Sequence, residues 1–148
     1  MPFRFALEPL RRLRYSIEHQ RMLALQEASF QLARKQELMA QFDKFLAESA
    51  LADANALSVG RTGADLQFAS LLRDQLQQFR RQIENEVRQL QDARNRAAAT
   101  YQKAYRDREA LDSLRARARH AYQIEQMRRQ QKELDAAYLL QRWQRRNG

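Results

Sequence analysis

The residues with the most distinctive chemistry lie in the stretch SVGRTGAD, residues 58–65, which holds two of the three glycines in the chain. Within it, Gly60-Arg61-Thr62-Gly63 has the spacing of the G-x-x-G loop with which some RNA-binding domains clamp a nucleic-acid backbone. Those domains place strands around the loop, whereas the sequence on both sides of this stretch is typical of helices. We therefore favour a turn between two helices over a clamp.

The sequence gives little support for a nucleotide-binding, metal-binding or catalytic site. No G-x-x-x-x-G-K-[ST] phosphate loop occurs. His19 and His120 are the only histidines, and neither is accompanied by ligand-type residues at metal spacing. Acidic residues are numerous, but a pair of helices offers no enclosed pocket that would desolvate them for general acid or base catalysis. The sequence therefore predicts a protein that is not an enzyme and that uses no cofactor or metal ion.

The composition is that of an almost continuously helical chain. Among 148 residues there are three glycines and two prolines, both prolines lie in the first nine residues, and Arg, Gln, Ala and Leu dominate. With 30% charged and 9% aromatic residues, each helix should bury one stripe against a partner helix. The absence of cysteine fits a reducing compartment. Because no apolar run is long enough for a secretory signal or a membrane span, we expect a cytosolic protein without membrane insertion.

Two helices and one turn account for the chain. The first helix is expected from about residue 8 to 57, with Pro9 in its first turn. The turn is expected at residues 58–64, and the second helix from about residue 65 to 146, where Thr62 and Asp65 have the spacing of a capping box. We predict an all-α fold with one coiled-coil domain over residues 1–148. Its two helices form an antiparallel coiled-coil hairpin whose second helix is longer and overhangs the first.

The register of this hairpin is predicted from residues that face each other, because their numbers add to a constant in an antiparallel pair. A sum of 121 sets large side chains opposite large ones and alanines opposite alanines, at spacings that alternate three and four. It also sets Lys35 opposite Glu86 and Arg14 opposite Asp107. The apolar pairs of this predicted seam are Leu7 with Leu114, Leu10 with Leu111, Ile17 with Ala104, Ala24 with Ala97, Ala28 with Ala93, Leu38 with Ile83, Phe42 with Phe79, and Phe45 with Leu76.

Two dimeric arrangements stay open beside the intramolecular hairpin. A parallel dimer of two long helices has the same periodicity, although Gly60 and Gly63 would each weaken a continuous helix by about 1 kcal/mol relative to alanine. A domain-swapped dimer would use the same register between two copies of the chain.

The predicted pairing leaves the end of the second helix without a partner. If Leu7 faces Leu114, residues 116–146 continue as a single helix of about 45 Å. The net charge of +9 is concentrated in the same part of the chain, since residues 115–148 carry +6, residues 1–21 carry +3 and the remainder is neutral. A merely solvated helix face would balance acids and bases, which this end does not. This basic end could bind nucleic acid, with aromatic side chains stacking on bases, but no basic-region motif precedes a dimerising zipper, so nucleic acid is not the partner that we favour. It could also enter an acidic protein channel.

Apolar side chains on this unpaired end also need a partner. Met127, Leu134 and Tyr138 share one face of the predicted helix, and a lone helix cannot bury them. We therefore expect a partner-binding helix. The complete apolar set is Ile124, Met127, Leu134, Tyr138, Leu139, Leu140 and Trp143.

Three features together resemble a known family. They are the opening FRFALEPLRRLR at residues 3–14, two long helices rich in Gln, Arg and Ala, and the segment QKELD at residues 131–135. The chain is similar over its whole length to the flagellar export proteins of the FliJ family. The resemblance implies an antiparallel coiled coil similar to the central stalk subunit of rotary ATPases. It also implies a soluble component of the flagellar type III export apparatus, associated with the inner membrane through that apparatus.

The resemblance further implies three protein partners: the hexameric export ATPase, the membrane-embedded export gate and the export chaperones. The unpaired basic end suits a stalk tip that enters the ATPase ring, with candidate contacts at Arg128, Arg129, Lys132, Arg142, Arg145 and Arg146. Contact with the gate or a chaperone would lie near the turn, at Phe68, Leu71, Leu72, Leu76 and Phe79. Of these, Leu72, Leu76 and Phe79 are also assigned to the seam. The alternatives are a basic nucleic-acid-binding coiled coil, a structural coiled coil, and the equivalent stalk protein of a type III injectisome.

Overall fold

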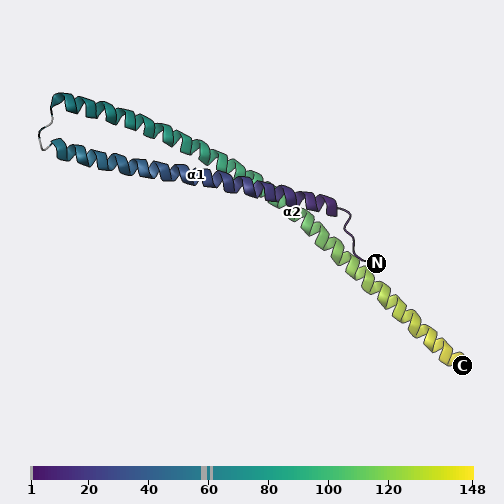
Figure 1. Ribbon diagram of the computed structural model, residues 1–148. Coiled ribbons are helices and arrows are strands. Elements are labelled where there is room, and N and C mark those ends of the chain that lie inside the picture. Colours follow the sequence, from purple (N-terminus) through teal and green to yellow (C-terminus); the bar gives the residue numbers. More distant parts are fainter. Residues whose placement is uncertain (1, 58–59, 61) are drawn as a thin grey trace. The chain divides into compact units, whose positions relative to one another are not determined.

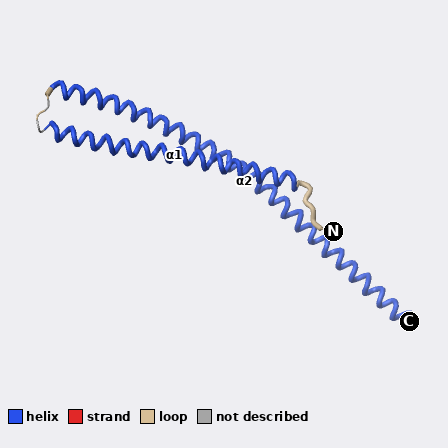
Figure 2. The backbone as a smooth tube through the Cα atoms, in the orientation of Figure 1, coloured by secondary structure: helices blue, strands red, loops and turns tan. Residues whose placement is uncertain are grey.

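The computed structural model describes residues 2–57, 60 and 62–148, and this part of the chain contains two helices and no strand. Helix α1 spans Glu8–Leu57 and helix α2 spans Gly63–Asn147 (Figure 1). Figure 2 shows the non-helical residues ahead of α1 in tan. The predicted helices begin and end within two residues of these bounds. Ser58, Val59 and Arg61 of the predicted turn lie outside the described residues.

Local chemistry explains where both helices begin. Pro9 lies in the first turn of α1, where its missing N–H leaves no hydrogen bond unmade. The Thr62 hydroxyl caps α2 by accepting a hydrogen bond of 3.3 Å from the backbone N–H of Asp65. Gly60, ahead of this cap, has φ of +88°, a conformation that favours glycine. Gly60 of the SVGRTGAD stretch therefore has a backbone role in the connection between the helices.

The contacts divide the chain into two compact units. Unit 1 consists of Met1–His19 and Lys103–Gly148, and unit 2 of Gln20–Gln102. Each unit pairs a segment of α1 with a segment of α2. The ion pairs join rising residue numbers in α1 to falling numbers in α2, so the segments are antiparallel; in unit 2 they are Lys35 with Glu86, Asp43 with Arg80, and Asp53 with Arg73. The predicted all-α fold of two antiparallel helices with a longer second helix is confirmed. The single domain over residues 1–148 stays a prediction.

The core of unit 2 is a narrow strip between the helices. Leu32, Ile83 and Val87 form its buried cluster, and Met39, Phe42 and Leu90 pack against them. Phe42 also meets Phe79 edge to face, with ring centroids 5.3 Å apart. Because two helices cover only one side of each other, seam residues keep contact with solvent, and Phe79 is 49% exposed.

The observed contacts show how far the predicted register holds. Lys35 and Glu86 form an ion pair, and so do Arg14 and Asp107, whose closest N and O atoms are 3.3 Å apart. Leu38, however, is 43% exposed, and Met39 packs against the core in its place. Both residues are apolar and stand four and three positions before Phe42, so the spacing rule alone does not choose between them.

In unit 1, the first turns of α1 cover Ala104 and Leu111 of α2, which are 6% and 7% exposed. The non-helical residues ahead of α1 continue this cover, because the ring of Phe3 lies 5.6 Å from that of Tyr122. The uncovered part of α2 therefore begins beyond Tyr122 and not at residue 116, as the predicted pairing of Leu7 with Leu114 implies, while the overhang itself is kept. Extended chain advances about 3.3 Å per residue against 1.5 Å in a helix, so a few residues reach several turns along α2.

Candidate partner-binding surfaces

A cluster of charged side chains in unit 1 fixes the start of α1 on α2. Arg108 donates hydrogen bonds of 2.7 and 3.2 Å to the two carboxylate oxygens of Glu18, and one of 3.0 Å to Asp112. Asp112 also accepts hydrogen bonds from Arg11, at 2.7 Å, and from the Tyr15 hydroxyl, at 2.8 Å. We call these five residues the clamp. Charge-assisted bonds between the helices have strict geometry, so the clamp determines how α1 lies on this part of α2.

The clamp shifts the pKa values of its own members. Burial by itself would raise the pKa of Asp112, but hydrogen bonds from Arg11, Tyr15 and Arg108 outweigh it and lower that pKa to about 2. The hydrogen bond to Glu18 is the largest cause of the raised pKa of Arg108. The bond to Asp112 is the largest cause of the raised pKa of Arg11. These three groups are therefore ionised at neutral pH, which suits a structural role.

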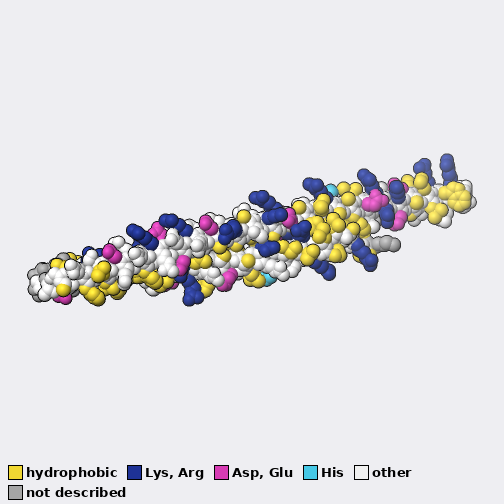
Figure 3. Space-filling model, turned by 90° about the horizontal axis from the view of Figure 1, so that it is seen from above, with side chains coloured by type: hydrophobic (Ala, Val, Ile, Leu, Met, Phe, Trp, Pro, Cys, Tyr) yellow, Lys and Arg dark blue, Asp and Glu magenta, His cyan; other side chains and the backbone are white. Residues whose placement is uncertain are grey.

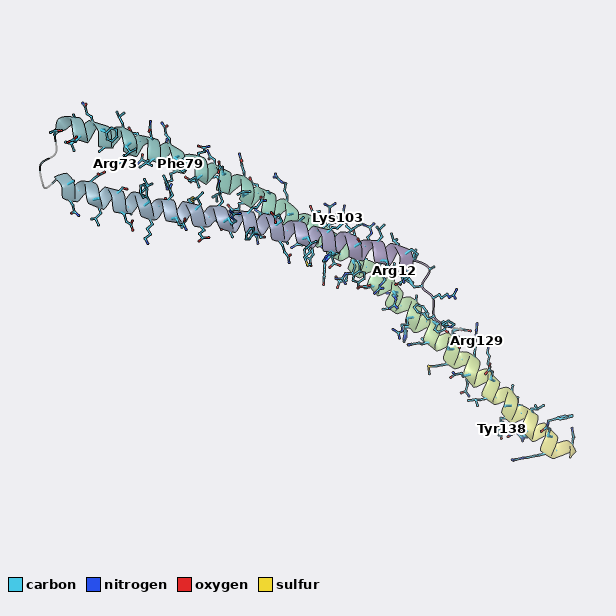
Figure 4. All side chains as sticks on the ribbon, viewed as in Figure 1. Arg12, Arg73, Phe79, Lys103, Arg129 and Tyr138 are labelled. Atoms are coloured by element: carbon cyan, nitrogen blue, oxygen red, sulfur yellow. The ribbon has the colours of Figure 1, made fainter. Side chains whose placement is uncertain are left out.

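The part of α2 beyond this cover is the C-terminal segment, residues 127–147, whose side chains are all exposed. In Figure 4, the labelled Arg129 and Tyr138 lie on this bare part of α2. Figure 3 shows hydrophobic and basic side chains exposed together at this end of the helix. The segment carries the six predicted ATPase contacts and two acidic residues, a net charge of +4. The structure thus brings the six basic residues onto one uncovered helix, which has the exposure that a contact surface needs.

Large apolar side chains lie on two opposite faces of the C-terminal segment. At about 100° per residue, Leu134 and Tyr138 lie within about 20° of Met127, whereas Leu140 and Trp143 point to the other side. Their exposed fractions range from 59% for Leu140 to 68% for Met127. Sequence reasoning identified the first face but missed that Leu140 and Trp143 form a second. The positions of these two residues in the helical repeat could have shown it.

A groove of about 790 Å³ lies in unit 2, between α1 and the first turns of α2. Phe68, Leu72 and Leu76 of the predicted gate or chaperone contact line it, with Phe45 from α1 opposite them. Phe68 is 68% exposed. The structure therefore brings three of the five predicted residues together in one apolar groove.

The other two predicted residues, Leu71 and Phe79, do not line this groove. Leu71 is 66% exposed, and Phe79 contacts Phe42 in the seam. Arg73, which is labelled in Figure 4, also lines the groove and donates a hydrogen bond of 3.2 Å to Asp53. This pair ties the two walls of the groove together.

Comparison with models of known protein families identifies the family of the chain. The family model described as the flagellar FliJ protein matches residues 3–148. The chain belongs to the FliJ family. Comparison with curated proteins and with solved structures gave no match. The match spans the clamp, the groove and the C-terminal segment, so these surfaces belong to a flagellar export-related protein.

In this FliJ-family chain, the opening FRFALEPLRRLR has structural contacts. Phe3 packs on Tyr122, and the guanidinium carbon of Arg115 lies 6.0 Å from the centre of the Phe3 ring. Glu8 forms ion pairs with Arg11, at 3.0 Å, and with Arg115, at 3.6 Å. The opening therefore fastens the start of the chain to α2.

The histidines and the glycines were the other candidate sites in the sequence. His19 and His120 are exposed. Among the described residues, no three His, Cys, Asp or Glu side chains come together as a metal site. A side chain added at Gly60 or Gly63 would meet nothing within 4 Å, so neither glycine marks a close approach. Neither α1 nor α2, within the described ranges, has an apolar stretch that could span a bilayer.

Proposed function

We propose that this FliJ-family protein is a stalk-like coupling protein of the flagellar type III export apparatus, and that its C-terminal segment binds the hexameric export ATPase. The observation that carries the proposal is the pair of opposite apolar faces on one uncovered helix. A flat partner surface covers only one side of a helix, so Leu134 and Trp143 cannot both be buried against it. A ring that surrounds the segment would bury both faces.

The charge of the segment supports the same partner. Its six basic residues are Arg128, Arg129, Lys132, Arg142, Arg145 and Arg146, all exposed. A group of exposed positive charges attracts an acidic channel over several ångströms, and this attraction speeds the encounter of the channel with the helix. The contacts of the clamp at Arg108 and Asp112, and of Phe3 with Tyr122, hold the part of α2 that precedes the segment, as a stalk that transmits movement requires.

We also propose that the groove of unit 2 binds the export gate or an export chaperone. Its apolar lining at Phe45, Phe68 and Leu72 suits the apolar face of an amphipathic helix. The gate and the ATPase would then contact different parts of the chain, which allows one protein to bind both. Peripheral association with the inner membrane would follow from the gate contact.

Truncation after Gln126 tests the ATPase proposal. This cut removes the C-terminal segment but keeps the contact between Phe3 and Tyr122 and the whole clamp. We expect the truncated chain to stay helical by circular dichroism but to lose binding to the export ATPase and stimulation of ATP hydrolysis. Phe68→Ser is the matched control, because it changes the groove and should leave ATPase binding intact. Full stimulation by the truncated chain would show that the segment is not the ATPase contact.

A further inference from the structure

One face of α2 in unit 1 carries a series of residues seven positions apart, in which each step turns the side chain by about 20° around the helix. Three steps, from Tyr122 to Trp143, turn it by about 60°, so both residues stay on the same side. Three members of the series contact residues ahead of or within α1. Arg108 pairs with Glu18 at 2.7 Å, Arg115 lies 3.6 Å from Glu8, and Tyr122 packs on Phe3. The series continues into the C-terminal segment as Arg129, Ala136 and Trp143. The face that α1 occupies therefore runs on beyond α1.

We call Arg129, Ala136, Leu140 and Trp143 the seam face, because they extend the α1–α2 seam. Leu140 and Trp143 are 59% and 61% exposed. The ion pair of Arg129 is with Glu125 on its own helix, at 3.6 Å. Arg108 and Arg115, in contrast, each have a carboxylate from α1. Arg129 is thus the next arginine of the series, and the two earlier arginines each pair with an acidic residue of α1.

We propose that the seam face receives an acidic amphipathic helix of a partner protein. This helix lies on the C-terminal segment as α1 lies on residues 104–118, with a carboxylate at Arg129 and apolar side chains over Leu140 and Trp143. Ala136 leaves room for a close approach, as Ala104 does under α1, where it is 6% exposed. The inference rests on the proposed function, because it assigns a chemistry to one of the two faces through which the segment would bind.

Charge selects this occupant over a second copy of the chain. Two C-terminal segments packed together would each bring a net charge of +4 to the contact, and like charges at a seam repel. An acidic helix instead offers the pairing that Glu18 and Glu8 already show in unit 1. An anionic membrane surface is also disfavoured. A helix that lies on a membrane has its apolar side chains on one face, whereas the C-terminal segment has them on two opposite faces.

Fluorescence of Trp143 tests the proposal, because it is the only tryptophan in the chain. The probe is a synthetic amphipathic peptide of about 20 residues, with Leu at the seam positions, Glu beside them and no aromatic residue. Added to the full-length protein, it should shift Trp143 emission to the blue and protect the indole from acrylamide. The same peptide with Lys in place of Glu is the control and should do neither.

Two matched pairs of variants then separate the faces. Leu140→Ser changes the seam face, and Leu134→Ser makes the same substitution on the opposite face. Arg129→Glu and Arg145→Glu form the second pair. We expect the seam-face variants to weaken peptide binding about tenfold or more, and the opposite-face variants by less than about twofold. Circular dichroism of each variant checks that the helix is kept.

Four outcomes would overturn the inference: equal losses on both faces, equal binding of the Lys peptide, self-association through the segment in place of peptide binding, or burial of Trp143 by anionic phosphatidylglycerol vesicles but not by the peptide. The truncation after Gln126 keeps this test distinct from that of the proposed function. If the truncated chain loses ATPase binding and the seam face binds no peptide, only the seam-face inference fails. If the peptide binds and the truncated chain still stimulates the ATPase, only the proposed function fails.

Discussion

The guanidinium of Arg108 spans both carboxylate oxygens of Glu18, at 2.7 and 3.2 Å, although the two residues are ninety positions apart in the sequence. The side chains are 18% and 15% exposed, so water screens the pair only in part. Arg108 also lies 5.2 Å from the centre of the Tyr15 ring and 4.8 Å from that of Tyr105. The start of α1 is therefore held on α2 by directional contacts.

Replacing Arg108 with alanine should destabilise unit 1 by about 1–3 kcal/mol, because Glu18 and Asp112 lose hydrogen bonds to a charged donor. Urea unfolding followed by circular dichroism measures this change. Arg106→Ala is the control, since Arg106 is exposed and a surface substitution of this kind should change the unfolding free energy by less than about 0.5 kcal/mol. Equal effects of the two substitutions would show that the clamp adds nothing to stability.

Acid should weaken the clamp through Asp112. Its pKa is lowered from 3.8 to about 2 in the folded chain, so between these values the unfolded chain binds more protons. The stability that Asp112 contributes is therefore complete above about pH 4 and is lost as the pH falls toward 2. Thermal unfolding of the wild type and of Asp112→Asn, followed from pH 6 to pH 2, measures it. The two melting temperatures should differ at pH 6 and converge at pH 2, and a constant difference would contradict this assignment.

The ion pair of Lys35 and Glu86 should show coupling in a double-mutant cycle. Reversing either charge alone sets like charges opposite each other across the seam of unit 2. Reversing both restores the attraction, with an expected coupling of about 0.5–1 kcal/mol because the side chains are 31% and 38% exposed. Simple additivity of the two single changes would mean that the pair does not help to set the register.

Phe3→Ala should loosen the non-helical residues ahead of α1. The substitution removes the ring contact with Tyr122 and the contact with the Arg115 guanidinium. Hydrogen exchange of residues 115–122 should become faster, since local opening depends on such packing. Phe30→Ala is the control, because Phe30 is 57% exposed and lies in unit 2. Unchanged exchange in residues 115–122 would show that Phe3 does not hold this part of the chain.

Several features were predictable because they depend on neighbouring residues or on a simple repeat. The cap at Thr62 and the start near Pro9 follow from side chains within one turn. The opposition of Lys35 to Glu86 follows from numbers that add to a constant. The six basic residues of the C-terminal segment were predictable as a group, because their density is visible in the sequence. Which partner each of them contacts stays a prediction.

Other features could not be predicted from spacing. Leu38 and Met39 are both apolar and both one turn from Phe42, and only the rotation of α1 against α2 placed Met39 on the core. The clamp was missed as a whole, although Arg14 and Asp107 beside it were paired. Its bonds run diagonally between the helices, from Arg11 and Tyr15 to one shared carboxylate, and a register that pairs residues one to one does not describe such contacts.

By itself, the sequence determined two helices, their antiparallel direction, and a basic end with apolar residues, because helix propensity, capping and heptad periodicity act over a few residues at a time. Only the tertiary structure decided that Phe3 extends the cover to Tyr122 and that Arg108, Arg115 and Tyr122 lie on the covered face. The physical reason is that these relationships depend on the path of the non-helical residues ahead of α1 and on the rotation of α1 relative to α2. Contacts between residues far apart in the chain set both.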